Sequence, residues 1–224
     1  MTETEVQNIY PRSAVVLGGT GLVGQELVQQ LVSDNAYEKV TLLLRRSSQN
    51  NHPKIDEHII DFEKPETWQH HINGNVLFSA LGTTIRVAKT KEAQFRVDHD
   101  YQLWAAQAAA KNGVANYVLI SSAGANEKSP IFYSRIKGQL ENEVSALGFE
   151  SCNLLRPGIL DGDRAEHRTL ERLSLKVLRR IPTWAMPPSA RPSPVEKVAR
   201  TCILADRAAQ PGKRIIEAAE ILEA

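Results

Sequence analysis

The sequence is poor in the residues that build disulfides and metal sites. It has two cysteines in 224 residues, and Cys152 and Cys202 lie far apart and match no metal-binding or redox spacing. The six histidines are scattered, and no acidic or cysteine cluster accompanies the adjacent pair His70 and His71. We therefore expect reduced thiols and no bound metal.

Long apolar runs and an excess of one charge are also missing. The formal net charge is +1, which gives no reason to expect attraction to nucleic acid or to a membrane surface. No run reaches transmembrane length, and residues 1–5 lack the basic-then-apolar order of a signal peptide. These absences predict a cytoplasmic protein without a nucleic-acid partner or membrane insertion. The length fits a single domain over residues 1–224.

What the sequence does have is a group of regularly spaced glycines directly after an apolar run. The run covers residues 13–17, and Gly18, Gly21 and Gly24 follow three residues apart. In a βαβ unit such glycines allow a sharp turn, close approach to a pyrophosphate and tight packing of the next helix. A glycine-rich turn that binds nothing is the alternative. The predicted cofactor contacts here are Gly18, Thr20, Gly21, Leu22 and Gly24.

Strand-like and helix-like segments alternate through the first two-thirds of the chain. The pattern predicts strands over residues 13–17, 39–44, 58–61, 75–80, 115–120, 151–155 and 214–217. It predicts helices from Leu22, from Pro65, over 91–112, over 131–147 and after Ser193-Pro194. This alternation indicates an α/β fold, a doubly wound parallel sheet (Rossmann fold), with a small C-terminal elaboration over 158–224 on the substrate side.

The end of the second predicted strand carries two arginines where an acidic residue would bind an NAD ribose. Arg45 and Arg46 suit the 2′-phosphate of NADP(H), which guanidinium groups grip with bidentate bonds. A solvated basic strand end is the alternative. Asp61 and Phe62 close the third strand and are placed to border an adenine ring.

Small residues follow the fourth predicted strand at the carboxyl edge of the sheet. Ala80, Leu81 and Gly82 would let the cofactor ribose and nicotinamide pass close to the backbone, because open α/β sheets bind ligands at this edge. A tight turn without a ligand would need the same residue types.

Tyr133 and Lys137 stand four residues apart at the start of the helix after the fifth strand. They share one helical face, and a nearby ammonium lowers the pKa of a phenol, which makes it a usable acid or base. Ser122, at the end of that strand, would hydrogen-bond the substrate oxygen, and Ser121 is an alternative for this role. An amphipathic helix with an exposed tyrosine and lysine would show the same spacing.

In this order the residues resemble the short-chain dehydrogenase/reductase superfamily, and among its branches the atypical, Tat-interacting-protein-like group. The resemblance rests on the glycine turn, Leu81-Gly82-Thr83-Thr84, Ser122, Tyr133, Lys137 and Arg156-Pro157-Gly158. It implies NADP(H) bound over the sheet, with Tyr133, Lys137 and Pro157 near it. It also implies Ser122, Tyr133 and Lys137 as the catalytic trio, in which Tyr133 passes the proton.

Two features depart from the superfamily pattern. Asp98 stands where many members have an asparagine that holds a relay water, and the interval between Ser122 and Tyr133 is short. We expect an NADP(H)-dependent oxidoreductase for a small carbonyl or alcohol, or an epimerase-type enzyme. A cofactor-sensing binding or regulatory protein is the alternative. The basic amphipathic stretch 164–180 fits a lid over the substrate, a subunit contact of a homodimer, or a basic surface, and packing on the domain alone would explain its apolar face.

Overall fold

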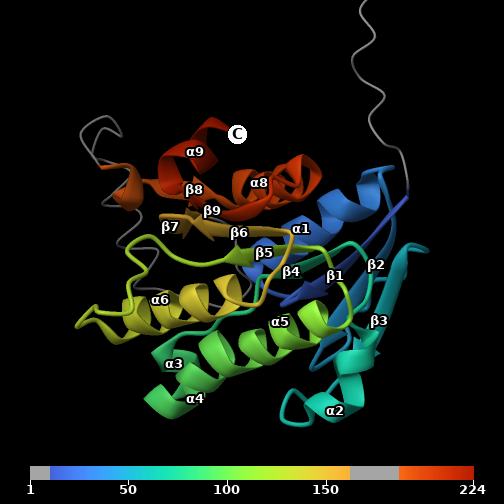
Figure 1. Ribbon diagram of the computed structural model, residues 1–224, viewed down its shortest axis with the longest axis horizontal. Coiled ribbons are helices and arrows are strands. Elements are labelled where there is room, and N and C mark those ends of the chain that lie inside the picture. The colour runs from blue at the N-terminus through green and yellow to red at the C-terminus, as the bar shows by residue number, and fades with distance from the viewer. Residues whose placement is uncertain (1–10, 162–186) are drawn as a thin grey trace, which may run out of the picture.

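Seven parallel strands form one sheet in the computed structural model, which describes residues 11–161 and 187–224. The strand order is β3-β2-β1-β4-β5-β6-β9, so the chain winds outward from β1 in both directions (Figure 1). The strands are β1 Arg12–Leu17, β2 Tyr37–Leu44, β3 Ile55–Ile59, β4 Val76–Ser79, β5 Asn116–Ile120, β6 Ser151–Arg156 and β9 Gly212–Glu217. The prediction of a doubly wound parallel sheet is confirmed.

Helices cover both faces of the sheet, as parallel strands require. One face carries α1 (Leu22–Ser33), α8 (Val195–Ala208) and α9 (Ala218–Glu223), which lie above the sheet in Figure 1. The other face carries α2 (Pro65–Trp68), α4 (Lys91–Phe95), α5 (Tyr101–Lys111) and α6 (Phe132–Ser145).

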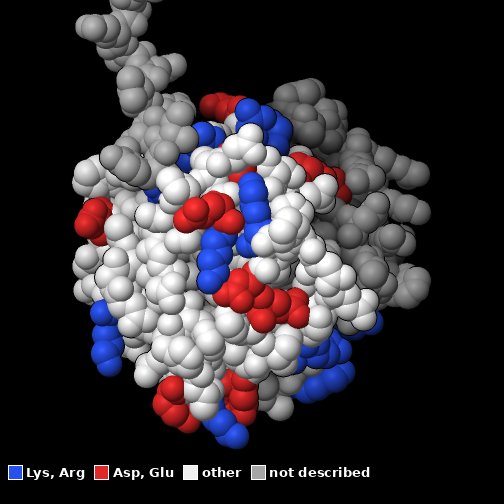
Figure 2. Space-filling model, turned by 90° about the vertical axis from the view of Figure 1, so that its right-hand side faces the viewer, with Lys and Arg blue, Asp and Glu red and all other residues white. Residues whose placement is uncertain are grey.

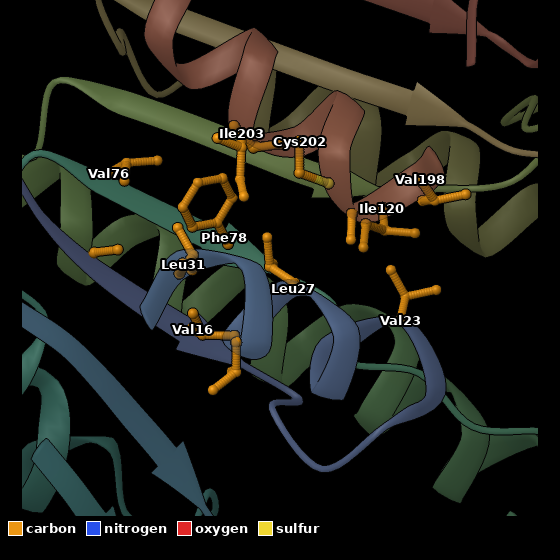
Figure 3. Packing of buried hydrophobic residues seen from close by; sticks show 14 of the residues in the cluster. Val16, Val23, Leu27, Leu31, Val76, Phe78, Ile120, Val198, Cys202 and Ile203 are labelled. Carbon is orange, nitrogen blue, oxygen red and sulfur yellow. The ribbon is translucent and has the colours of Figure 1, made fainter. Parts of the chain in front are cut away.

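The apolar face of α1 forms the core on the first side. Its residues Val23, Leu27 and Leu31 pack between the sheet and α8 (Figure 3). Phe78 of β4 and Cys202 of α8 belong to the same cluster and are at most 1% exposed. Cys202 is a free cysteine, and because its thiol is buried it packs like a small apolar side chain.

Small side chains bring α5 close to the other face of the sheet. Ala105, Ala106 and Ala109 are fully buried there, against Leu119 of β5. An alanine-rich helix can approach a sheet closely because its methyl groups occupy little space. The alanine run of the sequence therefore serves packing.

The predicted helix over 91–112 is interrupted in the structure. After α4 the backbone forms a π-helical segment, Arg96–Asp100, before α5 continues. This wider turn buries both Asp98 and His99. A π segment within a helix is frequent at functional sites and has no simple sequence signature.

The third strand and the C-terminal part also differ from the sequence prediction. β3 covers Ile55–Ile59, three residues earlier than predicted, because it is an edge strand and lacks a fully buried apolar run. A short helix α3 (Ile85–Ala88) and a two-stranded sheet of β7 (Ile159–Asp161) and β8 (Pro192–Pro194) were not predicted. The stretch 164–180 lies outside the described residues.

A buried carboxylate ties α8 to the beginning of the sheet. Asp206 is fully buried and accepts hydrogen bonds from Arg12 at 2.6 Å, from the Tyr37 hydroxyl at 2.5 Å and from Asn116 at 2.7 Å. Since three donors satisfy this charge, its removal would leave Arg12 without its partner and would cost about 3–5 kcal/mol.

Charges of both signs are interspersed near this end of the sheet. Figure 2 shows the right-hand side of the view in Figure 1, where neither positive nor negative side chains form a continuous patch. Arg207 and Asp34 make one of the surface ion pairs, at 3.3 Å. Within residues 11–161 and 187–224, none of the helices has the length and hydropathy of a bilayer-spanning helix.

Candidate cofactor and active site

The glycine turn after β1 is sterically closed to larger residues. Gly18 has a φ of +77°, and a Cβ on it would lie 2.6 Å from the carbonyl oxygen of Ala80. A Cβ on Gly24 would lie 2.0 Å from the carbonyl oxygen of Gly18. The turn therefore runs directly beside the end of β4, and the first turn of α1 rests on the backbone of the glycine turn.

The N-terminus of α1 points out of this turn without a side-chain cap. Its N-cap residue is Gly21, and no acidic residue occurs in the first turn. Exposed Thr20 and Gly21 lie at the opening. Free backbone N–H groups and the positive end of the helix dipole favour an anion here, so the residues fit a dinucleotide pyrophosphate.

Arg45 and Arg46 follow β2 directly and are both exposed. Neither has a hydrogen bond or an ion pair to a described residue. The loop that continues from them is held by Glu57 of β3, which accepts hydrogen bonds from the backbone N–H of Ser48 at 2.9 Å and from its hydroxyl at 2.5 Å. The structure thus presents two guanidinium groups at the edge where the sequence predicts the 2′-phosphate.

Asp61 and Phe62 follow β3 with different surroundings. The Asp61 side chain is 55% exposed, and its carbonyl oxygen accepts a hydrogen bond from the Trp68 indole at 2.9 Å. The Phe62 ring is 3% exposed and stacks on Tyr101 with centroids 5.0 Å apart. Because the ring belongs to the core, only the main chain of Phe62 is left to border an adenine.

The exit from β4 lies beside the glycine turn. The backbone N–H of Ala80 bonds to the Leu17 carbonyl at 3.0 Å, and Ala80 and Leu81 are half-buried. Gly82 is exposed, and a Cβ on it would approach Asp98 Oδ1 at 3.3 Å. This strand end therefore joins the glycine turn on one side to the π segment on the other.

Tyr133 and Lys137 lie one turn apart in α6 in contrasting environments. Tyr133 is 36% exposed, whereas Lys137 is 2% exposed. The Lys137 ammonium donates to the carbonyl of Ile120, the last residue of β5, at 3.4 Å. The start of α6 is thus held at the carboxyl end of β5.

The two serines after β5 differ in exposure. Ser122 is half-buried and its hydroxyl bonds to the Ala123 carbonyl at 3.3 Å. Ser121 is 5% exposed, and its hydroxyl has no hydrogen-bond partner in the part of the chain that the structure describes. Pro157, after β6, accepts a hydrogen bond from the Ala123 N–H at 2.9 Å, so the exits of β5 and β6 are joined.

Asp98 and Lys137 form an ion pair that is almost entirely buried. Their oxygen and nitrogen atoms are 4.0 Å apart, and the two side chains are 1% and 2% exposed. Asp98 also accepts a hydrogen bond from the backbone N–H of Thr83 at 3.2 Å. Burial raises the pKa of Asp98, while Lys137 and Thr83 oppose that rise. Burial lowers the pKa of Lys137, and the charges of Asp98 and Glu141 oppose that fall.

A second ion pair, in which the carboxylate is buried and the Arg156 side chain is 20% exposed, begins one turn further along α6. Glu141 is 2% exposed and receives two hydrogen bonds from Arg156, at 2.6 and 3.0 Å. This fork-to-fork pairing balances the negative charge of Glu141 near Lys137. The sequence interpretation did not include Glu141, although its helical spacing of four from Lys137 is the signal that places it on the same face.

The buried charges do not amount to a metal centre. Over residues 11–161 and 187–224, no group of three or more histidine, cysteine, aspartate or glutamate side chains is arranged to hold an ion. His58, His70 and His71 do gather, with the rings of His58 and His71 stacked at 3.7 Å. Because the two stacked rings contact each other face to face, their nitrogen atoms do not converge on a common metal position.

Comparison with protein families identifies the first part of the chain. Residues 18–173 match the family model described as NAD(P)H-binding. "Protein fmp52, mitochondrial" of Emericella nidulans is 36% identical over 169 residues, covering 72% of each chain. Protein HTATIP2 of Rattus norvegicus is 35% identical over 179 residues, covering 78% of this chain and 74% of that protein.

A solved structure shows the same fold with bound ligands. MoeE5 in complex with UDP-glucose and NAD superimposes with a TM-score of 0.69 over 92% of this chain and 75% of that chain, at 15% identity. At this identity the likeness concerns the fold alone.

The relatives contradict the expected location. The Emericella nidulans protein, like relatives from other fungi, is named mitochondrial. The cytoplasmic prediction for this chain, which rested on composition and on the missing signal-peptide pattern, is therefore wrong. Amino-acid composition reflects the interactions that stabilise a fold, and it carries little information about the cellular compartment.

Proposed function

The chain belongs to the NAD(P)H-binding family and to the atypical short-chain dehydrogenase/reductase superfamily, and from this we propose that it is an NADP(H)-dependent oxidoreductase. The proposed substrate is a small carbonyl compound or the matching alcohol. One observation carries the proposal: Lys137 is held at the end of β5, one turn from Tyr133. The glycine turn opens at the same edge of the sheet.

The residues around the glycine turn fit the cofactor. Gly18, Gly21 and Gly24 leave the space that side chains would fill, and the uncapped start of α1 suits the pyrophosphate. Arg45 and Arg46 would hold the 2′-phosphate. The remaining proposed contacts are Thr20, Leu22, Asp61, Phe62, Ala80, Leu81, Gly82, Tyr133, Lys137 and Pro157. When bound, NADPH supplies the hydride.

The residues of α6 and the β5 exit would handle the proton. In the proposed reduction, the Tyr133 hydroxyl gives its proton to the substrate oxygen, which Ser122 holds with a hydrogen bond. The ammonium of Lys137 stabilises the resulting phenolate, so the tyrosine becomes a stronger acid. Asp98 acts as a positioning residue, because its charge keeps Lys137 protonated in a place without water.

We assign substrate binding to the carboxyl edge of β4, β5 and β6, as part of a single domain. The described residues of 158–224 contribute there: Gly158 donates its N–H to the Ser193 hydroxyl at 3.0 Å, which joins the exit of β6 to β8. This contact supports the view that the C-terminal elaboration belongs to the same unit.

Replacing Tyr133 tests the proposed chemistry. Tyr133→Phe removes the proton donor and leaves the ring, so carbonyl-dependent loss of NADPH absorbance should fall by about a hundredfold or more, with NADPH affinity nearly unchanged. Tyr117→Phe is the matched control, because it removes a hydroxyl from the sheet core and should keep turnover. Equal turnover in Tyr133→Phe and wild type would exclude Tyr133 from the reaction.

The preference for NADP(H) is tested by calorimetry. Wild-type protein should bind NADPH at least about tenfold more tightly than NADH, because two guanidinium groups pair with the extra phosphate. The double variant Arg45→Ala/Arg46→Ala should bind both cofactors alike. Arg214→Ala, on β9, should keep the difference. Equal affinities in wild type would contradict the role given to Arg45 and Arg46.

A cofactor-sensing protein without turnover is the second candidate. The feature that favours it is Lys137, because its ammonium group already contacts Asp98 and the Ile120 carbonyl. This candidate predicts tight NADPH binding, no oxidation with any carbonyl, and a partner protein whose binding changes with NADPH.

A further inference from the structure

Five exposed apolar side chains lie in the connections that follow three neighbouring strands. The described residues include seven large hydrophobic side chains that are exposed, and only Ile59 and Leu204 lie elsewhere. The other five, which we call the apolar rim, are Ile85, Val87, Ile131, Tyr133 and Ile159, and they leave the ends of β4, β5 and β6.

Several contacts hold these three connections together. The connections after β5 and β6 are joined by the hydrogen bond from the Ala123 N–H to the Pro157 carbonyl at 2.9 Å. The connection after β4 is joined to α6 through Asp98, which contacts both Thr83 and Lys137. The residues of the apolar rim are therefore parts of one edge, and Tyr133 belongs to it.

The exposure of the apolar rim is costly unless a ligand covers it. Ile131 is 64% exposed, Val87 54%, Ile85 48% and Ile159 42%. Single exposed apolar residues are normal on any protein, but several together at one edge mark an interaction site. Because this edge also carries the proposed proton donor, the ligand that best explains the cluster is the substrate itself.

The charges near the apolar rim bear on whether the substrate is apolar or charged. Arg135 is held by the carbonyls of Ser129 and Pro130, at 2.7 and 3.3 Å, and Lys91 lies over the Phe132 ring at 5.6 Å. These cations are engaged with the protein itself. Arg86 is exposed on α3, so a charged substrate is the competing possibility that an experiment must address.

We propose that the apolar rim binds the hydrocarbon part of the substrate, which is an aldehyde or ketone with an alkyl chain of several carbons, or its alcohol. This rests on the proposed function and narrows it. In the reduction, the hydride of NADPH adds to the carbonyl carbon and the Tyr133 proton to the oxygen, giving the alcohol and NADP⁺. The alkyl chain takes no part in these bonds and lies against Ile85, Ile131 and Ile159.

Binding of straight-chain alcohols to NADPH-saturated protein tests this without turnover, because the reduced cofactor cannot oxidise an alcohol. Calorimetric affinity should rise by about fourfold for each added methylene from 1-butanol to 1-octanol. Ile131→Ser and Ile85→Ser should each lower the affinity for 1-octanol by about tenfold. Leu204→Ser is the matched control, since Leu204 is 46% exposed on α8, and it should bind 1-octanol like wild type.

Several results would overturn the proposal. These are an affinity that does not change with chain length, an equal loss in Leu204→Ser, or tight binding of UDP-glucose in place of 1-octanol. A dimer that dissociates in Ile131→Ser, with no alcohol binding in wild type, would assign the apolar rim to a second copy of the chain. If alcohols bind as expected but no carbonyl is reduced, the surface is correctly assigned and the proposed function fails.

Discussion

The ammonium group of Lys137 is buried, because the residue is only 2% exposed. Two of the groups near its nitrogen are the Ile120 carbonyl oxygen at 3.4 Å and an Asp98 carboxylate oxygen at 4.0 Å. A buried ammonium loses its proton easily unless an opposite charge is near. Asp98, together with Glu141, therefore favours the protonated state of Lys137, one helical turn from Tyr133.

Asp98→Asn should move the alkaline limb of the kcat/KM profile to lower pH. The sign follows from the charges: Asp98 favours protonated Lys137, so its removal lowers the pKa of Lys137 further and the ammonium is lost earlier as pH rises. On the alkaline side, kcat/KM should fall by about tenfold or more. The measurement is kcat/KM for NADPH oxidation as a function of pH, with a carbonyl substrate that is soluble enough to saturate the enzyme.

Asp100→Asn provides the control for this change. Asp100 lies in the same π segment but contacts His99 and Arg96 and is 25% exposed. Its replacement should leave the alkaline limb where it is. If Asp98→Asn gives the same profile as wild type, Asp98 has a structural role only.

At the scale of single elements, α1 depends on the glycine turn on which it rests. Gly24→Ala should lower the free energy of unfolding by about 2 kcal/mol, because the new methyl group would lie 2.0 Å from the Gly18 carbonyl and the helix must shift. Urea unfolding measures this, and NADPH affinity should fall as well. Gly19→Ala is the matched change, since its methyl would meet Leu42 at an ordinary 3.4 Å. Equal stability of the two variants would contradict this account of Gly24.

The elements that the sequence predicted well are those with a strong local signal. The buried strands β1, β4 and β5 are continuous apolar runs, and α1 has a regular apolar face, so local periodicity was sufficient. The edge strand β3 has no such run, and its register is set by pairing with β2. The π segment depends on where Asp98 and His99 are buried, which is a tertiary effect.

The whole molecule brings the candidate site together from residues that are distant in the chain. Gly18, Ala80, Ser122, Lys137 and Pro157 come from the four connections that follow β1, β4, β5 and β6, and they meet at the carboxyl edge of one parallel sheet. The sequence could predict these residues because the fold class fixes which strand ends are neighbours. It could not predict the pairing of Asp98 with Lys137, or the second pair of Glu141 with Arg156, because those depend on side-chain burial between the π segment, α6 and β6.

The transfer of deuterium from labelled NADPH tests the central claim most directly. Wild-type protein is incubated with an alkyl aldehyde and NADPH that carries deuterium at both C4 positions, and the alcohol is analysed by mass spectrometry beside that from Tyr133→Phe. An NADP(H)-dependent oxidoreductase predicts one deuterium on the carbinol carbon with wild type and almost none with Tyr133→Phe. NADPH that binds tightly while no labelled alcohol forms from any carbonyl of a broad panel would contradict the claim.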